Sequence, residues 1–153
     1  MNAQELTAII VAAKAASYVG DGHSVYPCRT GAHDVRWSDG AWHYLDSYFG
    51  GTDFVGQETL WHHHEPIWSI AYCGRILRPE RIDAGRAGAT IKAALGALYR
   101  EGRFLGGHRW EGPHGVYDDT SDGDALRFIG QETITVGGEI AYRLHYFGGL
   151  IRA

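Results

Sequence analysis

Two glutamates occupy matching positions in two similar segments, and their chemistry suits proton transfer or cation binding. Glu58 ends a Phe-x-Gly-x-Glu motif at residues 54–58, and Glu132 ends the same motif 74 residues later, at 128–132. Alternation with period 2 puts each glutamate on the apolar face of a strand. An apolar setting raises a carboxyl pKa, so either glutamate could be a catalytic acid or base. The structural alternative is that each caps a turn or pairs with a neighbouring Arg or Tyr.

Aromatic residues at strand spacing predict either a ligand pocket or cross-strand core packing. Strand parity groups Trp68 with Tyr72, and Tyr142 with Tyr146. Buried tyrosine hydroxyls need hydrogen-bond partners, and an apolar core therefore uses few of them. An acidic cleft lined by such rings would attract cations by charge and by cation–π contact. The predicted ligand-binding residues are Asp46, Tyr48, Trp68, Tyr72, Trp110, Tyr142 and Tyr146.

Three further segments carry weaker signals. Asp46 lies inside a strand-like run, where we expect it to bond turn amides near residues 50–51 rather than to act in catalysis. The histidines at 62–64 fall at a predicted hairpin tip, and alternating side chains let at most two of them share a metal. We therefore expect no metal and no other cofactor. Residues 108–115 predict a long glycine-rich loop, either a plain connector or a lid.

The elements that must position these residues are two helices and several strands. Asn2 and Glu5 form a capping box that starts a helix over residues 3–18, and a second apolar stripe predicts a helix over 87–101. Hairpins are expected within 54–76 and 128–150, with further strands at 34–38, 41–49 and 115–118. Strands and helices do not alternate as βαβ units. The sequence thus predicts an α+β fold, with both helices on one face of an antiparallel sheet.

The repeated segment predicts an internal duplication. The match between residues 54–76 and 128–150 runs without a gap. Half-repeats of about 1–78 and 79–153 would form a single domain with pseudo-two-fold symmetry. A cleft between the two halves is the expected place for a ligand.

Composition restricts the class of partner. The chain has 153 residues and a formal net charge of −4, with no basic run that would favour nucleic acid. No stretch of 18 apolar residues predicts a membrane span, and the N-terminus lacks the features of a signal peptide. Cys28 and Cys73 are expected to be free thiols in a reducing cytoplasm.

Several spaced motifs together resemble a bacterial domain family of unknown function, over about Leu6 to Ile151. Members of that family stand alone or follow a helix-turn-helix DNA-binding domain, which implies a ligand-sensing module. Glu111 stands where the family favours Arg. The motifs are Asp-Ser-Tyr-Phe-Gly-Gly at 46–51, Phe-x-Gly-x-Glu at 54–58 and 128–132, Trp-x-x-x-Tyr-x-Gly at 68–74 and Tyr-x-Gly-Gly-x-Ile at 146–151.

Three functions follow as hypotheses. The first is a domain that binds a small hydrophobic or cationic molecule in the acidic cleft. The second is an acid–base enzyme, an isomerase, lyase or hydrolase, in which Glu58 and Glu132 are catalytic. The third is a protein-interaction module or homodimer, in which the aromatic residues face a partner chain.

Overall fold

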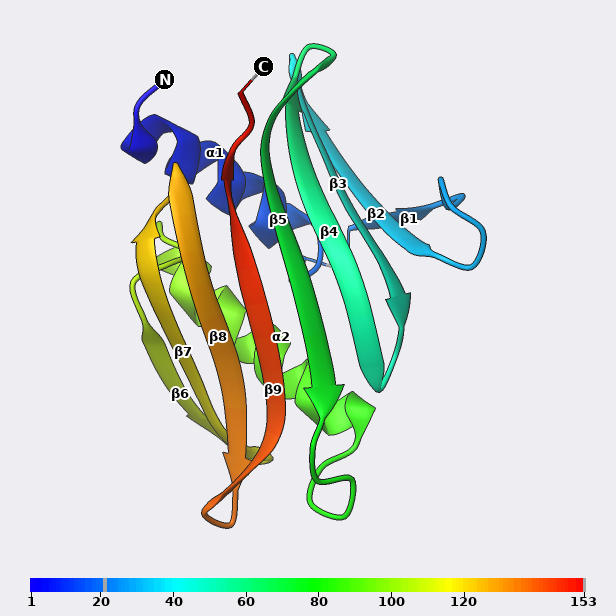
Figure 1. Ribbon diagram of the computed structural model, residues 1–153, viewed down its shortest axis with the longest axis vertical. Helices are drawn as coiled ribbons and strands as arrows, with labels where there is room; N and C mark the ends of the chain where they lie inside the picture. The colour runs from blue at the N-terminus through cyan, green and yellow to red at the C-terminus, as the bar shows by residue number, and fades with distance from the viewer. Residues whose placement is uncertain (21, 153) are drawn as a thin grey trace.

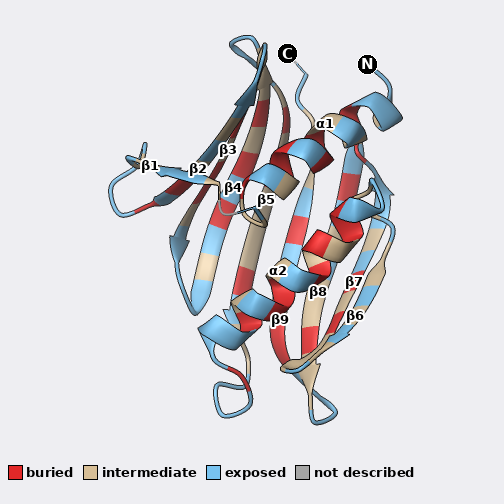
Figure 2. Cartoon of the chain, turned by 180° about the vertical axis from the view of Figure 1, so that it is seen from behind, coloured by how far each residue is buried: buried red, intermediate tan, exposed pale blue. Residues whose placement is uncertain are grey.

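The computed structural model describes residues 1–20 and 22–152. Within them, nine strands form one curved antiparallel sheet, and two helices lie across the same face of it (Figures 1 and 2). The elements are α1 (Ala3–Ala16), β1 (His23–Val25), β2 (His33–Asp39), β3 (Trp42–Gly50), β4 (Asp53–His62), β5 (Glu65–Ile76), α2 (Ala84–Arg100), β6 (His108–Gly112), β7 (Gly115–Asp124), β8 (Arg127–Val136) and β9 (Glu139–Leu150).

The strand order is β1-β2-β3-β4-β5-β9-β8-β7-β6. The chain builds β1 to β5 as successive neighbours, crosses the sheet through α2, and returns from the far edge as β6 to β9 (Figure 1). We call β1–β5 the first half-sheet and β6–β9 the second half-sheet. They meet where β5 pairs with β9, and Tyr72 lies opposite Tyr146 in that pair.

N-terminal capping determines where each helix begins, and an apolar stripe determines which face of each helix packs against the sheet. The Asn2 side chain accepts a hydrogen bond from the Glu5 amide, and the Glu5 carboxylate accepts one from the Asn2 amide, each at 2.9 Å. Asp83 caps α2 by accepting from the Arg86 amide at 2.8 Å. The apolar faces of both helices are buried against the sheet, at Leu6, Ile10 and Ala13 of α1 and at Ala87, Ile91, Ala94 and Leu98 of α2.

The repeated motifs have a packing explanation, because each motif glycine lies opposite an aromatic ring of the next strand. A Cβ atom on Gly56 would lie 2.3 Å from the Tyr72 ring, and one on Gly130 would lie 2.3 Å from the Tyr146 ring. Only glycine lets these rings lie flat across the neighbouring strand. The same relation holds for Phe54 over Gly74 and Phe128 over Gly148.

The structure confirms a mixed α+β fold with two helices and an antiparallel sheet in the described residues. The prediction that residues 108–115 form a loop was wrong. Residues 108–112 are β6, which pairs with β7, so that Trp110 lies opposite Tyr117. Glycine, histidine and proline favour loops, but an edge strand also tolerates them because one side of it needs no ladder partners.

Other predictions concern small details of the chain. The histidines at 62–64 do form a hairpin tip, where His63 has a positive φ of 56°. Cys28 and Cys73 are free thiols. Among residues 1–20 and 22–152, no group of His, Cys, Asp or Glu is arranged to hold a metal ion. In the same residues, neither helix has the length and apolarity that a membrane-spanning helix requires.

Candidate functional site

A cavity of about 410 Å³ lies between the helix-covered face of the sheet and the two helices. Its rim includes exposed residues at the β3–β4 turn and at the start of α2, namely Gly50, Gly51, Thr52 and Ala84. Apolar and aromatic side chains from α2 and the sheet make up most of the walls. Four carboxyl groups, from Asp46, Glu58, Asp119 and Glu132, also line the cavity.

The first half-sheet supplies the first acid pair, Asp46 and Glu58, which lie opposite each other on β3 and β4. Both are buried, at 5% and 9% exposure. The Tyr72 hydroxyl donates a hydrogen bond to Oδ1 of Asp46 at 2.5 Å, and Nζ of Lys14 lies 2.5 Å from Oε2 of Glu58. Burial, with the nearby Glu58 carboxylate, raises the pKa of Asp46 to about 7, although Tyr72 and Lys14 act in the opposite direction.

The second half-sheet supplies the second acid pair, Asp119 and Glu132, which lie opposite each other on β7 and β8. The Tyr146 hydroxyl donates to Oδ1 of Asp119 at 2.7 Å. Burial raises the pKa of Asp119 to about 6, against the lowering effects of Tyr146 and Arg103. Burial, followed by repulsion from Asp119, raises the pKa of Glu132 to about 8.

Several buried oxygens near the second acid pair are unpartnered. Among the described residues, Oδ2 of Asp119, Oε2 of Glu132 and the Tyr142 hydroxyl have no hydrogen-bond partner. Oε2 of Glu58 also completes no hydrogen bond, but it forms the ion pair with Lys14. The Tyr117 hydroxyl is close enough to lower the pKa of Glu132, yet it completes no hydrogen bond. Buried polar atoms are normally satisfied, so such a cluster is a candidate for contact with a ligand.

Lys14 is the single Lys or Arg side chain among the described residues that line the cavity. It comes from the buried face of α1 and is 8% exposed. Besides its ion pair with Glu58, its ammonium lies 6.0 Å from the centre of the Phe104 ring. One lysine therefore faces four carboxyl groups, and the cavity is acidic whenever more than one of them is ionised.

The tyrosines around the carboxyl groups remain neutral. Burial and the neighbouring carboxylates raise the pKa of Tyr44, Tyr72, Tyr99 and Tyr142 well above the ordinary value. Each hydroxyl therefore keeps its proton and can donate a hydrogen bond at any physiological pH. The site thus combines proton donors with carboxyl groups that titrate near neutrality.

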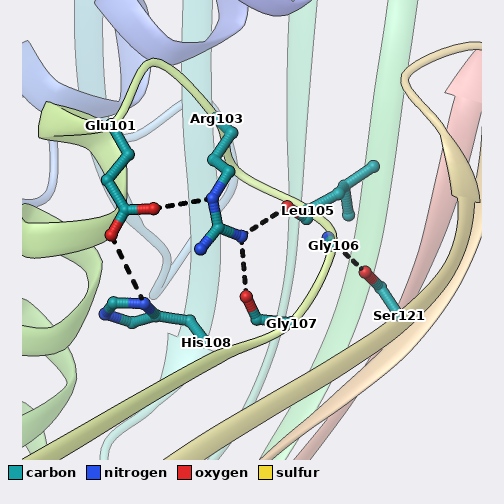
Figure 3. Close-up of polar contacts among 7 residues, drawn as sticks. All are labelled: Glu101, Arg103, Leu105, Gly106, Gly107, His108 and Ser121. Carbon is teal, nitrogen blue, oxygen red and sulfur yellow. Dashed lines mark hydrogen bonds and ion pairs between the residues drawn. The ribbon is translucent and has the colours of Figure 1, made fainter.

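A polar network fixes the loop between α2 and β6 at one end of the cavity (Figure 3). The Arg103 guanidinium donates to Glu101 at 2.8 Å and to the carbonyls of Leu105 and Gly107 at 3.0 and 2.6 Å. The remaining contacts are a hydrogen bond from the Gly106 amide to Ser121 Oγ at 2.8 Å and a 4.0 Å approach of His108 to Glu101.

This fixed loop places Phe104 in the cavity wall. The Phe104 side chain is 7% exposed, and its ring meets the Trp68 ring edge-to-face, with centroids 5.8 Å apart. Phe104 also faces the Lys14 ammonium. The network around Arg103 therefore supports the surface against which Lys14 is held.

The structure brings together most of the residues predicted from sequence. Trp68 is fully buried beside the cavity, where its indole donates to the Ala125 carbonyl at 3.1 Å. Trp110 lies on β6 over Gly112, away from the cavity lining. Asp46 bonds the Tyr72 hydroxyl rather than the turn amides that the sequence suggested. The predicted residues that line the cavity are Asp46, Tyr48, Glu58, Tyr72, Glu132, Tyr142 and Tyr146.

Among the charged residues of the site, sequence reasoning missed Asp119 and Lys14. The signal for Asp119 is a Tyr-x-Asp pattern at 44–46 that recurs at 117–119, a spacing of 73 rather than 74 residues. Asp119 and its partner Glu132 are 13 positions apart, whereas Asp46 and its partner Glu58 are 12 apart, and this extra residue shifts the match. The signal for Lys14 is its place on the buried stripe of α1, eight residues after Leu6.

Comparison with known protein families gives one match. Residues 46–151 match the model of a family described as a domain of unknown function (DUF5680). The chain belongs to this family. The matched DUF5680 region starts at Asp46 and so contains all four carboxyl residues of the cavity, whereas Lys14 precedes it. No curated protein and no solved structure matches the chain.

Proposed function

We propose that this DUF5680 chain is a small-molecule-binding domain and that its ligand occupies the cavity between the helices and the two half-sheets. The observation that carries the proposal is the set of four carboxyl groups in a cavity of about 410 Å³. Buried carboxyl groups destabilise a fold unless they are paired, and two of these, Asp119 and Glu132, have an oxygen with neither a hydrogen bond nor an ion pair. Perturbed carboxyl groups in a concave, aromatic-lined cavity are typical of functional sites.

The chemistry of the cavity favours a ligand with an apolar body and a positive charge. Ionised carboxylates attract a cation, and the neutral tyrosine rings add cation–π attraction. The apolar walls from α2, including Ile91 and Leu95, would contact the body of the ligand. Anionic ligands are disfavoured because Lys14 is already paired with Glu58.

We also propose that the chain arose by internal duplication and that the cavity lies between the two copies. The strand pairing supports the duplication. The matched segments 54–76 and 128–150 form β4–β5 and β8–β9, and each is an antiparallel pair of neighbouring strands. Tyr72 and Tyr146, equivalent in the two segments, face each other where the half-sheets meet. Each half-sheet also carries one acid pair and one tyrosine that bonds its aspartate.

A thermal-shift panel of hydrophobic amines, with alcohols and carboxylic acids of matched shape, tests the binding proposal. A ligand at 100 times its Kd stabilises a protein by about 2.7 kcal/mol, which raises the Tm of a domain this size by several degrees. We expect amines to give the shifts. Gly88 lines the cavity, and a Cβ there meets no atom within 4 Å, so Gly88→Leu should block the site while Gly88→Ala should not. Absence of any shift across all classes would contradict the proposal.

A second candidate function is acid–base catalysis in the same cavity. It is favoured by the pKa values of Asp119, Asp46 and Glu132, raised to about 6, 7 and 8, which match proton transfer near neutral pH. In this scheme an ionised Glu132 would take a proton from a substrate, and a neutral tyrosine would donate one. Most aromatic residues of the third hypothesis, an interaction module, line the cavity, whereas Trp68 and Trp110 do not.

Isotope exchange separates catalysis from simple binding. Ligands found in the panel would be incubated with the protein in D₂O and examined by mass spectrometry for deuterium at carbon. Exchange that disappears in Glu132→Gln, with binding retained, would support an enzyme. Binding without exchange or product for every ligand of the panel would leave the binding domain as the function.

A further inference from the structure

The two acid pairs differ in their ion pairing, because only the first forms an ion pair with a lysine of the protein. We infer that the cavity takes a ligand with a single ammonium group, which binds at the second acid pair, because Lys14 already supplies the ammonium of the first. The inference rests on the proposed function and adds to it the charge of the ligand and the place of its cationic group.

Lys14 shows how this cavity accommodates an ammonium group. Its Nζ atom lies 2.5 Å from Oε2 of Glu58, and the lysine side chain is buried. A second cation beside Glu58 would be repelled by the Lys14 ammonium. The other member of the pair, Asp46, is occupied by the hydrogen bond from Tyr72. The first acid pair thus has a cation and a hydrogen-bond donor from within the protein, although Oε2 of Glu58 completes no hydrogen bond.

The second acid pair has no such ion pair, although the Lys14 ammonium also lowers the pKa of Glu132. Within residues 1–20 and 22–152, neither Asp119 nor Glu132 takes part in an ion pair. Arg103 lowers the pKa of Asp119, but its guanidinium is bound to Glu101 and to two loop carbonyls (Figure 3). Glu132 lines the cavity as a half-buried residue, whereas Glu58 is buried.

The surroundings of Glu132 supply acceptors for an ammonium group. Oδ2 of Asp119, Oε2 of Glu132 and the Tyr142 hydroxyl are buried and unpartnered, and all three residues line the cavity. A primary ammonium has three N–H donors, so it could satisfy this set in the way that Lys14 satisfies Glu58. A second ammonium on the same ligand would meet Lys14 and be repelled by it.

Calorimetric titration at pH 8 with three probes tests the inference: 2-phenylethylamine as the monocation, 2-phenylethanol as the neutral analogue, and 1,4-bis(aminomethyl)benzene as the dication. We expect the monoamine to bind the wild type at least about tenfold more tightly than either other probe, a difference of about 1.4 kcal/mol. Glu132→Gln and Asp119→Asn, both close in shape to the wild type, should each weaken monoamine binding about tenfold or more. Near-ultraviolet circular dichroism would confirm that both variants are folded.

Lys14→Met sharpens the test, because it frees Glu58 for a second ammonium. We expect this variant to gain affinity for the diamine, relative to the monoamine, by about tenfold. Wild-type protein that prefers the diamine, or monoamine binding that survives both Glu132→Gln and Asp119→Asn, would overturn the inference while leaving a ligand cavity in place. If no member of the wider panel shifted the Tm, the proposed function would fail as well.

Discussion

The two half-sheets present the same kinds of side chain to the cavity, but only the first half-sheet has its acid pair in an ion pair with a lysine of the protein. Each contributes an aspartate opposite a glutamate, and a tyrosine that bonds the aspartate across a glycine. The first half-sheet also receives Lys14 from α1, while no lysine or arginine side chain from the described residues pairs with the second acid pair. This difference is the basis of the proposal that a cation from a ligand binds at the second acid pair.

The largest effect is expected from Lys14→Met, which removes the cation of the first half-sheet. Breaking a buried ion pair by deleting one partner costs about 3–5 kcal/mol, because the remaining charge is left unpaired. Urea denaturation at pH 8 would measure the loss. The double variant Lys14→Met with Glu58→Gln should recover most of it, since no buried charge is left. A cost below about 1 kcal/mol for Lys14→Met would show that the two half-sheets do not differ in this way.

The next effect concerns Gly56 and Gly130, each of which lies against a tyrosine ring in its own half-sheet. Gly56→Ala and Gly130→Ala place a Cβ atom 2.3 Å from a tyrosine ring, so each should destabilise the fold by about 1–3 kcal/mol. Gly88→Ala is the matched control, because it meets no atom within 4 Å and should stabilise α2 by up to about 1 kcal/mol. Thermal unfolding of the three variants would compare them. If only one of Gly56→Ala and Gly130→Ala left the stability unchanged, the two half-sheets would not be packed alike.

Smaller effects are expected from Tyr72→Phe and Tyr146→Phe, each of which deletes the hydrogen bond to an aspartate. Each variant should lose about 1–2 kcal/mol of stability. Because the hydroxyls lower the aspartate pKa values, the pKa of Asp46 should rise above about 7 in the first variant, and that of Asp119 above about 6 in the second. Carbon-13 NMR titration of the carboxyl groups would follow both. Unchanged pKa values would show that the bonds are not made in solution.

The predicted effect at Glu132 has the opposite sign. The pKa of Glu132 is raised to about 8, so the folded protein holds a proton that the unfolded chain loses near pH 4. Stability from this group is present below about pH 4 and is lost as pH rises through about 8. Glu132→Gln removes that loss and should stabilise the protein at pH 8, with little change at pH 4.

Glu58→Gln is the control for this variant. It breaks the ion pair with Lys14 and should destabilise the protein at pH 8. Thermal unfolding of both variants across this pH range would show the contrast. The same sign for the two substitutions at pH 8 would remove the distinction between the half-sheets.

The fold class could be predicted from sequence because periodicity and capping are local properties. Asn2 and Glu5 identified the start of α1, and alternation identified the faces of the strands that carry Glu58 and Glu132. The strand order could not be predicted, because the pairing of β5 with β9 joins segments that are far apart in the chain. The edge strand β6 was missed because its composition is that of a loop.

The candidate site was predicted in part for a similar reason. Strand parity placed Tyr72 and Tyr146 on the correct face, but it also placed Trp68 there, although Trp68 packs behind the cavity. Parity gives the face of a residue and not its position along the sheet. The contribution of Lys14 depends on how α1 crosses the sheet, which is a tertiary property that no local pattern encodes.

The most direct test of the account is proton release on binding of 2-phenylethylamine at pH 7, measured by calorimetry in buffers that differ in ionisation enthalpy. Since Glu132 is mostly protonated at pH 7, an ammonium bound there should expel its proton into the buffer. The account predicts release of close to one proton per amine in the wild type and of almost none in Glu132→Gln. A binding heat that does not depend on the buffer would contradict it, because the amine would then bind without ionising this carboxyl group.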